Sequence, residues 1–205
     1  MTTDPVTDTK LDQRRREIIQ AAYKVFAEKG YRDAGIADIA AELKLGHGTF
    51  YRYFKNKRDI FLSVVMQVAE RLAAAIASEP PDASRTLAEY RAQVRRWGHK
   101  LLEVIQKDPR IARILLHEAM AVDQEMTEAV NRSWDISAQI TESYLVNGKK
   151  RGYLRADLDT RITSMALNAI IFEAMRRGVG QTGSSELVET WIDAIEKLMF
   201  DGIRA

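Results

Sequence analysis

The sequence predicts an all-α protein, because it contains few helix-breaking residues and its apolar residues recur at helical spacing. Only 11 Gly and 4 Pro occur among 205 residues, against average usages of roughly 7% and 5%. Apolar side chains repeat every three or four positions along most of the chain. The absence of cysteine excludes disulfide scaffolds, thiol catalysis and thiolate metal sites. We therefore expect about nine helices, which the length allows to form one or two domains.

The N-terminal part of the chain predicts three helices in a compact arrangement. A first helix ends at Gly30, a residue that suits a left-handed helix cap. A short apolar stripe at 36–43 predicts a second helix, and the segment 45–48 interrupts it. Phe50 and Phe54, four residues apart, predict a third helix. Two short helices joined by a turn and packed on a longer helix form a helix-turn-helix.

The third of these helices has two chemically different faces. At about 100° per residue, Phe50 and Phe54 point inward, whereas Gly48 and Arg52 point outward. Arginine reads guanine through two hydrogen bonds, and hydroxyl groups suit phosphate oxygens. For the tyrosines of this helix, burial in the core with only the hydroxyl exposed is the alternative. The further residues that we expect to face DNA are Thr49, Tyr51, Tyr53 and Lys57.

The charge distribution agrees with this assignment. Residues 1–60 carry 12 Lys and Arg against 9 Asp and Glu, whereas the rest of the chain is nearly balanced. The segment 46–58 holds four cations, one histidine and no acid, together with several aromatic residues. A cationic stretch with interleaved aromatic residues is typical of a phosphate-contacting surface. A solvated basic face without a partner remains the alternative.

Residues 30–59, GYRDAGIADIAAELKLGHGTFYRYFKNKRD, resemble the N-terminal signature of the TetR family of transcriptional repressors. The resemblance implies a three-helix DNA-binding domain at residues 10–57, with the segment 47–54 in the major groove. By position, it implies phosphate contacts for Thr49, Tyr51 and Lys57. It places His47, Gly48 and Arg52 at or near base edges.

Three positions depart from the family pattern. Ala34-Gly35 stands where a Thr or Ser usually precedes the second helix, so one hydroxyl contact and helix cap is missing. Lys44 stands in place of a turn glycine, and either adopts a left-handed conformation or reshapes the turn. Gly46 replaces a Ser as the cap of the third helix, and glycine is an acceptable cap.

The remaining residues, 58–205, predict a second helical domain for ligand binding and dimerisation. We expect helices ending near Ser78 and at Asp108-Pro109, then one from Pro109 to Ala119 and one that ends at Arg151. Asn147-Gly148 is an alternative end for that last helix. The final two helices are apolar nearly all round, so each must be covered on more than one side. A second subunit is the expected cover, and burial within one chain is the alternative.

For a ligand, the sequence indicates chemistry without identity. Trp97 lies beside Gly98, a helical glycine that leaves room either for close packing or for part of a cavity. Pockets are mostly apolar with a few polar groups, so we expect a small apolar or aromatic effector. Simple core packing is the alternative for each residue. The residues that we associate with this site are Trp97, Met120, Trp134, Tyr144, Phe172 and Met175.

The sequence thus predicts a cytoplasmic, homodimeric regulator that binds a double-stranded DNA operator, most simply as a repressor. We expect no cofactor, no metal and no enzymatic activity, because His99 and His117 lack the spacing of metal ligands and no catalytic constellation emerges. No apolar run approaches the roughly 18 residues that a membrane span needs. A helical sensor that acts through a protein partner and a small-molecule-transforming enzyme are the rival hypotheses.

Overall fold

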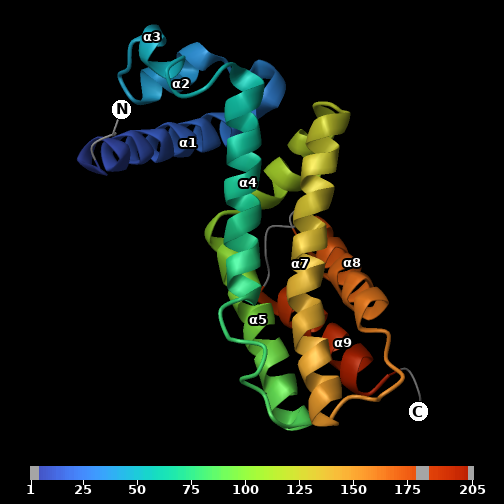
Figure 1. Ribbon diagram of the computed structural model, residues 1–205. Coiled ribbons are helices and arrows are strands. Elements are labelled where there is room, and N and C mark those ends of the chain that lie inside the picture. The colour runs from blue at the N-terminus through green and yellow to red at the C-terminus, as the bar shows by residue number, and fades with distance from the viewer. Residues whose placement is uncertain (1–4, 179–184, 203–205) are drawn as a thin grey trace. The chain divides into compact units, whose positions relative to one another are not determined.

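The computed structural model describes residues 5–178 and 185–202, and this part of the chain is helical without strands (Figure 1). The all-α prediction is confirmed, with nine α-helices in the described ranges. Their contacts divide the chain into two compact units, residues 1–68 with 113–130 and residues 69–112 with 131–205. The helices are α1 Pro5–Asp33, α2 Ile36–Glu42, α3 His47–Phe50, α4 Lys57–Ile76, α5 Leu87–Lys107, α6 Arg110–Arg113, α7 Gln124–Arg151, α8 Thr160–Gly178 and α9 Ser185–Phe200.

The first unit contains the head, which we define as α1, α2 and α3. Figure 1 shows α2 and α3 lying together along one side of α1. The interior between them is apolar, with Ile18, Phe26, Ile39, Phe50 and Phe54 almost completely buried. The helical conformation of α1 is interrupted at Gly30, whose φ of +78° is the left-handed cap that the sequence predicts.

The departures from the family pattern at the start of α2 are accommodated by neighbouring side chains. Gly35 occupies the N-cap without a side chain, and its N–H donates to the Asp38 carboxylate at 2.8 Å. Lys29 donates to the same carboxylate at 2.7 Å, and these bonds hold the pKa of Asp38 below its usual value. Asp38 therefore pairs the N–H of Gly35, whereas no cap side chain accepts from the first N–H groups of α2. At the other end of α2, Lys44 adopts the left-handed conformation, with φ +53°.

The third helix is shorter than the resemblance implies. Regular α-helix covers only the four residues His47–Phe50, and the chain then continues in turns to Phe54. The Phe54 N–H still donates to the Phe50 carbonyl at 3.1 Å, and the Tyr53 N–H donates to the same oxygen at 2.9 Å. The segment 47–54 therefore keeps helix-like turns as far as Phe54, although only its first half is regular α-helix.

The segment between Pro109 and Ala121 also differs from the expected single helix. It begins as α6, continues as a π-helix over Ile114–Glu118, and ends as a 3-10 turn over Ala119–Ala121. Single π-turns are rare in proteins and occur often at functional sites. Periodicity cannot reveal such a turn, because one extra residue shifts the apolar stripe only locally.

In the second unit, α7 runs unbroken to Arg151, so the alternative end at Asn147-Gly148 is wrong. Gly152 then adopts φ +79° and ends the helix. The Tyr144 hydroxyl donates to the Ile76 carbonyl at 3.1 Å. Asn168 donates to Thr141 at 3.0 Å in the buried layer between α7 and α8. These bonds satisfy polar groups inside an otherwise apolar bundle.

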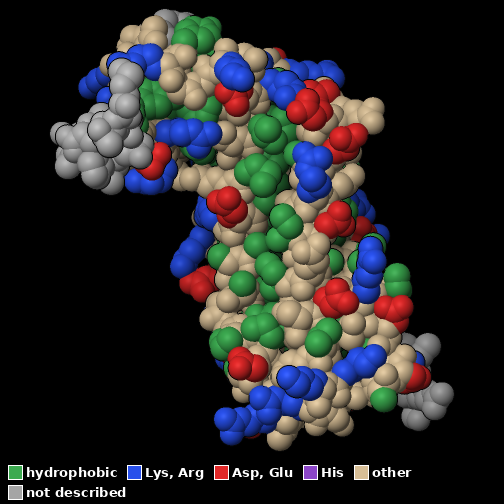
Figure 2. All heavy atoms as spheres, viewed as in Figure 1, with side chains coloured by type: hydrophobic (Ala, Val, Ile, Leu, Met, Phe, Trp, Pro, Cys, Tyr) green, Lys and Arg blue, Asp and Glu red, His purple; other side chains and the backbone are tan. Residues whose placement is uncertain are grey.

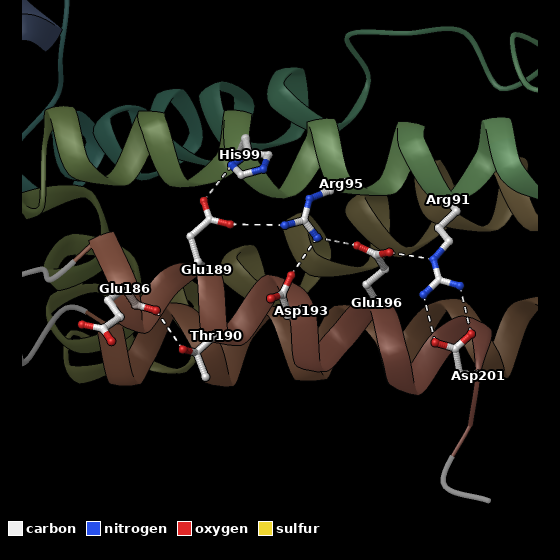
Figure 3. Close-up of polar contacts among 9 residues, drawn as sticks. All are labelled: Arg91, Arg95, His99, Glu186, Glu189, Thr190, Asp193, Glu196 and Asp201. Atoms are coloured by element: carbon white, nitrogen blue, oxygen red, sulfur yellow. Dashed lines mark hydrogen bonds and ion pairs between the residues drawn. The ribbon is translucent and has the colours of Figure 1, made fainter. Parts of the chain in front are cut away.

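Helices α5 and α9 are joined by a row of ion pairs, which we call the ladder (Figure 3). Arg91 pairs with Glu196 and Asp201, and Arg95 pairs with Asp193 and Glu196, at 2.6–2.9 Å. A Cβ added at Gly98 would lie 3.1 Å from the Ile192 side chain. Of the two roles considered for Gly98, the structure therefore supports close helix packing.

Charged side chains cover much of the surface. Lys and Arg side chains appear at several places on the head in Figure 2. No helix within residues 5–178 and 185–202 combines the length and apolarity that crossing a bilayer requires.

We expect Phe50→Ala to destabilise the head by about 3–5 kcal/mol, because it leaves a cavity in the interior that holds the third helix. Phe50 is 1% exposed, whereas its neighbour Tyr51 is 55% exposed. Tyr51→Ala is therefore the control, with an expected change within about 0.5 kcal/mol. Urea unfolding of both variants measures the difference, and equal losses would contradict this account of the anchoring.

Candidate functional site

The outward face of the third helix carries the side chains that the sequence assigns to DNA. Phe50 and Phe54 are each 1% exposed, whereas Arg52 is exposed. The predicted orientation of this segment is therefore confirmed. Tyr51 is exposed, while Thr49 and Tyr53 are half-buried. The structure does not describe the side chain of His47, so the prediction that His47 faces DNA lies outside the described part of the chain.

No residue that the structure describes requires glycine at position 48. Its φ is not positive, and a Cβ added there would meet no described atom within 4 Å. The head therefore has room for a side chain at this exposed position. Glycine at an exposed position permits another molecule to approach the backbone closely.

The four cations of the segment 46–58 fall into two pairs. The side chains of Arg52 and Lys55 are exposed and make no ion pair or side-chain hydrogen bond with any residue that the structure describes. The other two are engaged within the first unit. Lys57 donates to the carbonyls of Arg32 and Ala34, and Arg58 pairs with acidic residues of the segment 113–130.

The ammonium group of Lys57 has a structural role that the sequence did not indicate. It lies 3.0 Å from the Arg32 carbonyl and 2.9 Å from the Ala34 carbonyl, and 4.7 Å from the centre of the Tyr31 ring. These contacts hold the chain where it leaves α1. An ammonium group has three donors, so one N–H of Lys57 is left for the predicted phosphate contact.

A second set of contacts joins the end of α1 to the π-helix within the same unit. The backbone N–H of Tyr31 donates to the Glu118 carboxylate at 2.8 Å. Arg113 donates to that carboxylate at 3.2 Å. A Cβ added at Gly30 would lie 3.1 Å from a Glu118 oxygen, so the carboxylate and the left-handed glycine fit closely together.

The first turn of α4 is joined to the start of α7 by Arg58, in contacts that we call the Arg58 clamp. Arg58 donates to Asp123 at 2.6 and 3.1 Å, and to Glu125 at 2.7 Å. The guanidinium, followed by the Met126 N–H, lowers the pKa of Asp123 to about 2. The two helices are thus fixed to each other beside the head, across 65 residues of sequence.

The residues associated with a ligand do not form one group. Trp97 and Tyr144 are buried with ring centres 4.1 Å apart, and Trp134 lies 5.1 Å from Phe172. Met175 is also buried in the second unit, whereas Met120 belongs to the first unit and is exposed. Within the described ranges, no cluster of three or more His, Asp or Glu residues could hold a metal ion. His99 instead lies 3.3 Å from Glu189.

Comparison with known proteins gives a consistent picture. Residues 18–64 match the sequence model of a family described as bacterial regulatory proteins, tetR family. The chain is 27% identical over 187 residues to the fatty acid metabolism regulator protein of Bacillus subtilis (strain 168), covering 89% of this chain and 92% of that protein.

Solved structures of similar proteins share the fold. The fatty acid degradation regulator FadR of Bacillus halodurans matches with a TM-score of 0.79 and 22% identity, over 100% of this chain and 99% of that chain. The transcriptional regulator FadR of Bacillus subtilis, solved in complex with stearoyl-CoA, matches with a TM-score of 0.74 and 25% identity, over 92% and 99%.

We expect Arg58→Gln to raise the pKa of Asp123 from about 2 toward its ordinary value of 3.8. A depressed carboxyl pKa contributes stability that is present above the ordinary pKa and is lost as the pH falls toward 2. The clamp should therefore weaken in wild-type protein between about pH 4 and pH 2. Carboxyl NMR titration measures the change. Glu173, whose pKa of about 2 depends on Arg176 and Arg177, is the internal control and should not move.

Proposed function

This chain belongs to the TetR family of bacterial regulatory proteins and is a DNA-binding transcriptional regulator, and we propose that it is a homodimeric repressor. In this proposal the dimer binds a palindromic operator in the cytoplasm, and a small apolar or aromatic molecule bound to the region 58–205 releases it. The residues 10–57 form the DNA-binding domain.

One observation carries the DNA-binding part of the proposal. The segment 47–54 is anchored by two buried phenylalanines, so it presents Arg52 outward beside a glycine that the chain itself does not need. A guanidinium without a partner among the described residues suits the N7 and O6 acceptors of guanine in the major groove. We assign base contacts to His47, Gly48 and Arg52, and phosphate contacts to Thr49, Tyr51, Tyr53 and Lys57.

Exposed apolar residues of α8 and α9 support a dimer. On α8, Ile162, Met165, Ala166 and Ala169 are exposed at helical spacing. On α9, Ala194 and Leu198 are exposed four residues apart. A second copy of the chain is the occupant that fits, because a recognition helix reads few base pairs and a two-fold dimer places two of them on separate half-sites.

Release by a ligand requires that the ligand bind one conformation of the dimer more tightly than the other. Helices α4 and α7 contribute residues to both compact units, and the Arg58 clamp joins their beginnings. A ligand that displaces one helix against the other would strain this clamp and move the head. The stearoyl-CoA complex of the Bacillus subtilis relative makes a long acyl chain one candidate for the apolar ligand.

Selection of random DNA duplexes by the purified chain tests the proposal, with an inverted repeat as the expected product. Arg52→Ala should then weaken binding by about 1–3 kcal/mol and relax the preference at one position of each half-site. Lys57→Ala should weaken binding to all sequences and lower the salt slope by about one per subunit. It should also lower thermal stability, because two backbone carbonyls lose their donor.

The two variants separate base reading from phosphate binding, provided that affinities are measured on protein shown to be folded by circular dichroism. Equal losses on all sequences for both variants would refute the role of Arg52. If no inverted repeat is enriched from the random pool, the alternative of a sensor acting through a protein partner is favoured.

For the dimer, we expect Met165→Lys to give monomers in sedimentation equilibrium and to abolish tight operator binding. A lysine at this position would place a charge in an apolar interface. Ile136→Lys on α7 is the matched control, because Ile136 is 49% exposed and Met165 is 48% exposed. A Met165→Lys protein that remains dimeric would show that α8 does not form the interface.

A further inference from the structure

Helix α5 carries three buried polar atoms that have no hydrogen-bond partner in the part of the chain that the structure describes. They are the Tyr90 hydroxyl, the Gln93 side-chain oxygen Oε1 and the Trp97 indole Nε1. Tyr90 and Gln93 are each 1% exposed, and Trp97 is 7% exposed. Buried polar groups are nearly always paired, so three orphans on one helix need an explanation.

These atoms belong to one stripe of the helix, which we call the polar row. At about 100° per residue, Gln93 lies about 60° from Tyr90 and about 40° from Trp97 around the helix axis. The Gln93 amide nitrogen Nε2 lies 3.4 Å from the Pro80 carbonyl, and the Gln93 side chain also hydrogen-bonds the Glu79 carboxylate, whereas its oxygen Oε1 has no partner among the described residues. The row offers an acceptor at Gln93, a donor at Trp97, and either at Tyr90.

A pocket of about 180 Å³ is lined by Gln93, the middle residue of this row, whereas Tyr90 and Trp97 are not among its lining residues. Gln93 belongs to both features, because it lines the pocket and also lies on the buried stripe. Glu89 and Arg96 of α5 also line the pocket, and both side chains are exposed. The complete lining is Ala83, Ser84, Glu89, Ala92, Gln93 and Arg96.

Contacts on another face of α5 hold its rotation. Arg91 and Arg95 pair with the three carboxylates of the ladder and with Glu189 (Figure 3). Gly98 fits against Ile192 with little space to spare. The orientation of Tyr90, Gln93 and Trp97 is therefore imposed by contacts on a different face of the helix.

The neighbouring hydroxyl groups are already occupied. Tyr144, whose ring contacts Trp97, donates its hydroxyl toward the carbonyls of Ile76 and Glu79. Tyr153, whose ring contacts Tyr90, shares hydrogen bonds with Ser84 and Asn147. The polar row thus differs from the equally buried Tyr144 and the half-buried Tyr153, whose hydroxyl groups have hydrogen-bond partners.

We propose that the pocket and the polar row bind the uncharged polar end of the effector, a group with a donor beside an acceptor, such as a carboxamide. Gln93 Oε1 accepts from the donor, and Trp97 Nε1 donates to the acceptor. The four steps from residue 93 to residue 97 rise about 6 Å along the helix, a distance that one amide and two hydrogen bonds of about 2.9 Å bridge. The row itself holds no ionised side chain to compensate a buried charge, and the charged Glu89 and Arg96 of the pocket lining are exposed, so the group that reaches the row is uncharged.

This inference rests on the proposed function, which assigns a small ligand to the region 58–205, and it narrows the chemistry of that ligand. The hydrocarbon part of an acyl chain has neither donor nor acceptor, so it would leave the row unpaired. A molecule with an apolar body and a neutral amide end would contact the surrounding rings and pair Gln93 Oε1 and Trp97 Nε1.

Three probes of nearly the same shape test the proposal on the full chain without DNA. Benzamide has a donor and an acceptor, acetophenone has only the acceptor, and α-methylstyrene has neither. NMR titration should give the affinity order benzamide, acetophenone, α-methylstyrene, with each step at least about threefold. Gln93→Met should remove the advantage of benzamide over acetophenone. Equal binding of the three probes to wild-type protein, or an unchanged ratio in Gln93→Met, would overturn the proposal.

Thermal unfolding provides a second test that does not depend on any probe. Tyr90→Phe and Gln93→Met remove unpaired atoms and should leave Tm unchanged or raised. Tyr153→Phe is the matched control and should lower Tm, because its hydroxyl is bonded to Ser84 and Asn147. If Tyr90→Phe lowers Tm as much as Tyr153→Phe does, the polar row is satisfied within the free protein and the proposal fails.

Operator selection with wild-type protein stays a separate readout, and its failure would refute the proposed function instead.

Discussion

The opposition between two buried phenylalanines and one exposed arginine is the constraint on which the DNA-facing part of the protein depends. The helix that carries them has only four regular residues, too few to be stable by propensity alone. Its conformation comes from the burial of Phe50 and Phe54, and the Arg15 guanidinium lies 4.9 Å from the centre of the Phe54 ring. Anchoring by aromatic side chains fixes the rotation of the segment, and the rotation decides that Arg52 faces outward.

The cations near this segment show why charge alone does not define a binding surface. Four of them lie within residues 46–58, yet Lys57 holds backbone carbonyls and Arg58 holds Asp123 and Glu125. Only Arg52 and Lys55 of these four are left without such partners among the described residues. The engaged pair positions the head, so the basic stretch combines an orienting function with a contacting one.

The sequence predicted features that depend on neighbours along the chain, and missed those that depend on distant residues. The left-handed Gly30, the inward Phe50 and the helix order all follow from local spacing. The partner of Gly98 is Ile192, and the partners of Arg95 lie between 94 and 101 residues away. No periodicity links such positions. The π-helix was equally hidden, because its register change disturbs the apolar pattern over less than two turns.

The polar row raises the question of why a fold keeps unpaired atoms in its interior. Each such atom destabilises the free protein by about 1–3 kcal/mol, whereas apolar residues of similar size would remove that cost. Local rules of this kind are broken mainly at functional sites. A ligand that pairs these atoms recovers free energy that the unliganded protein lacks. Under the proposed function, such a ligand releases the operator only if the DNA-bound conformation closes the pocket to it, because a ligand with equal affinity for both conformations shifts nothing.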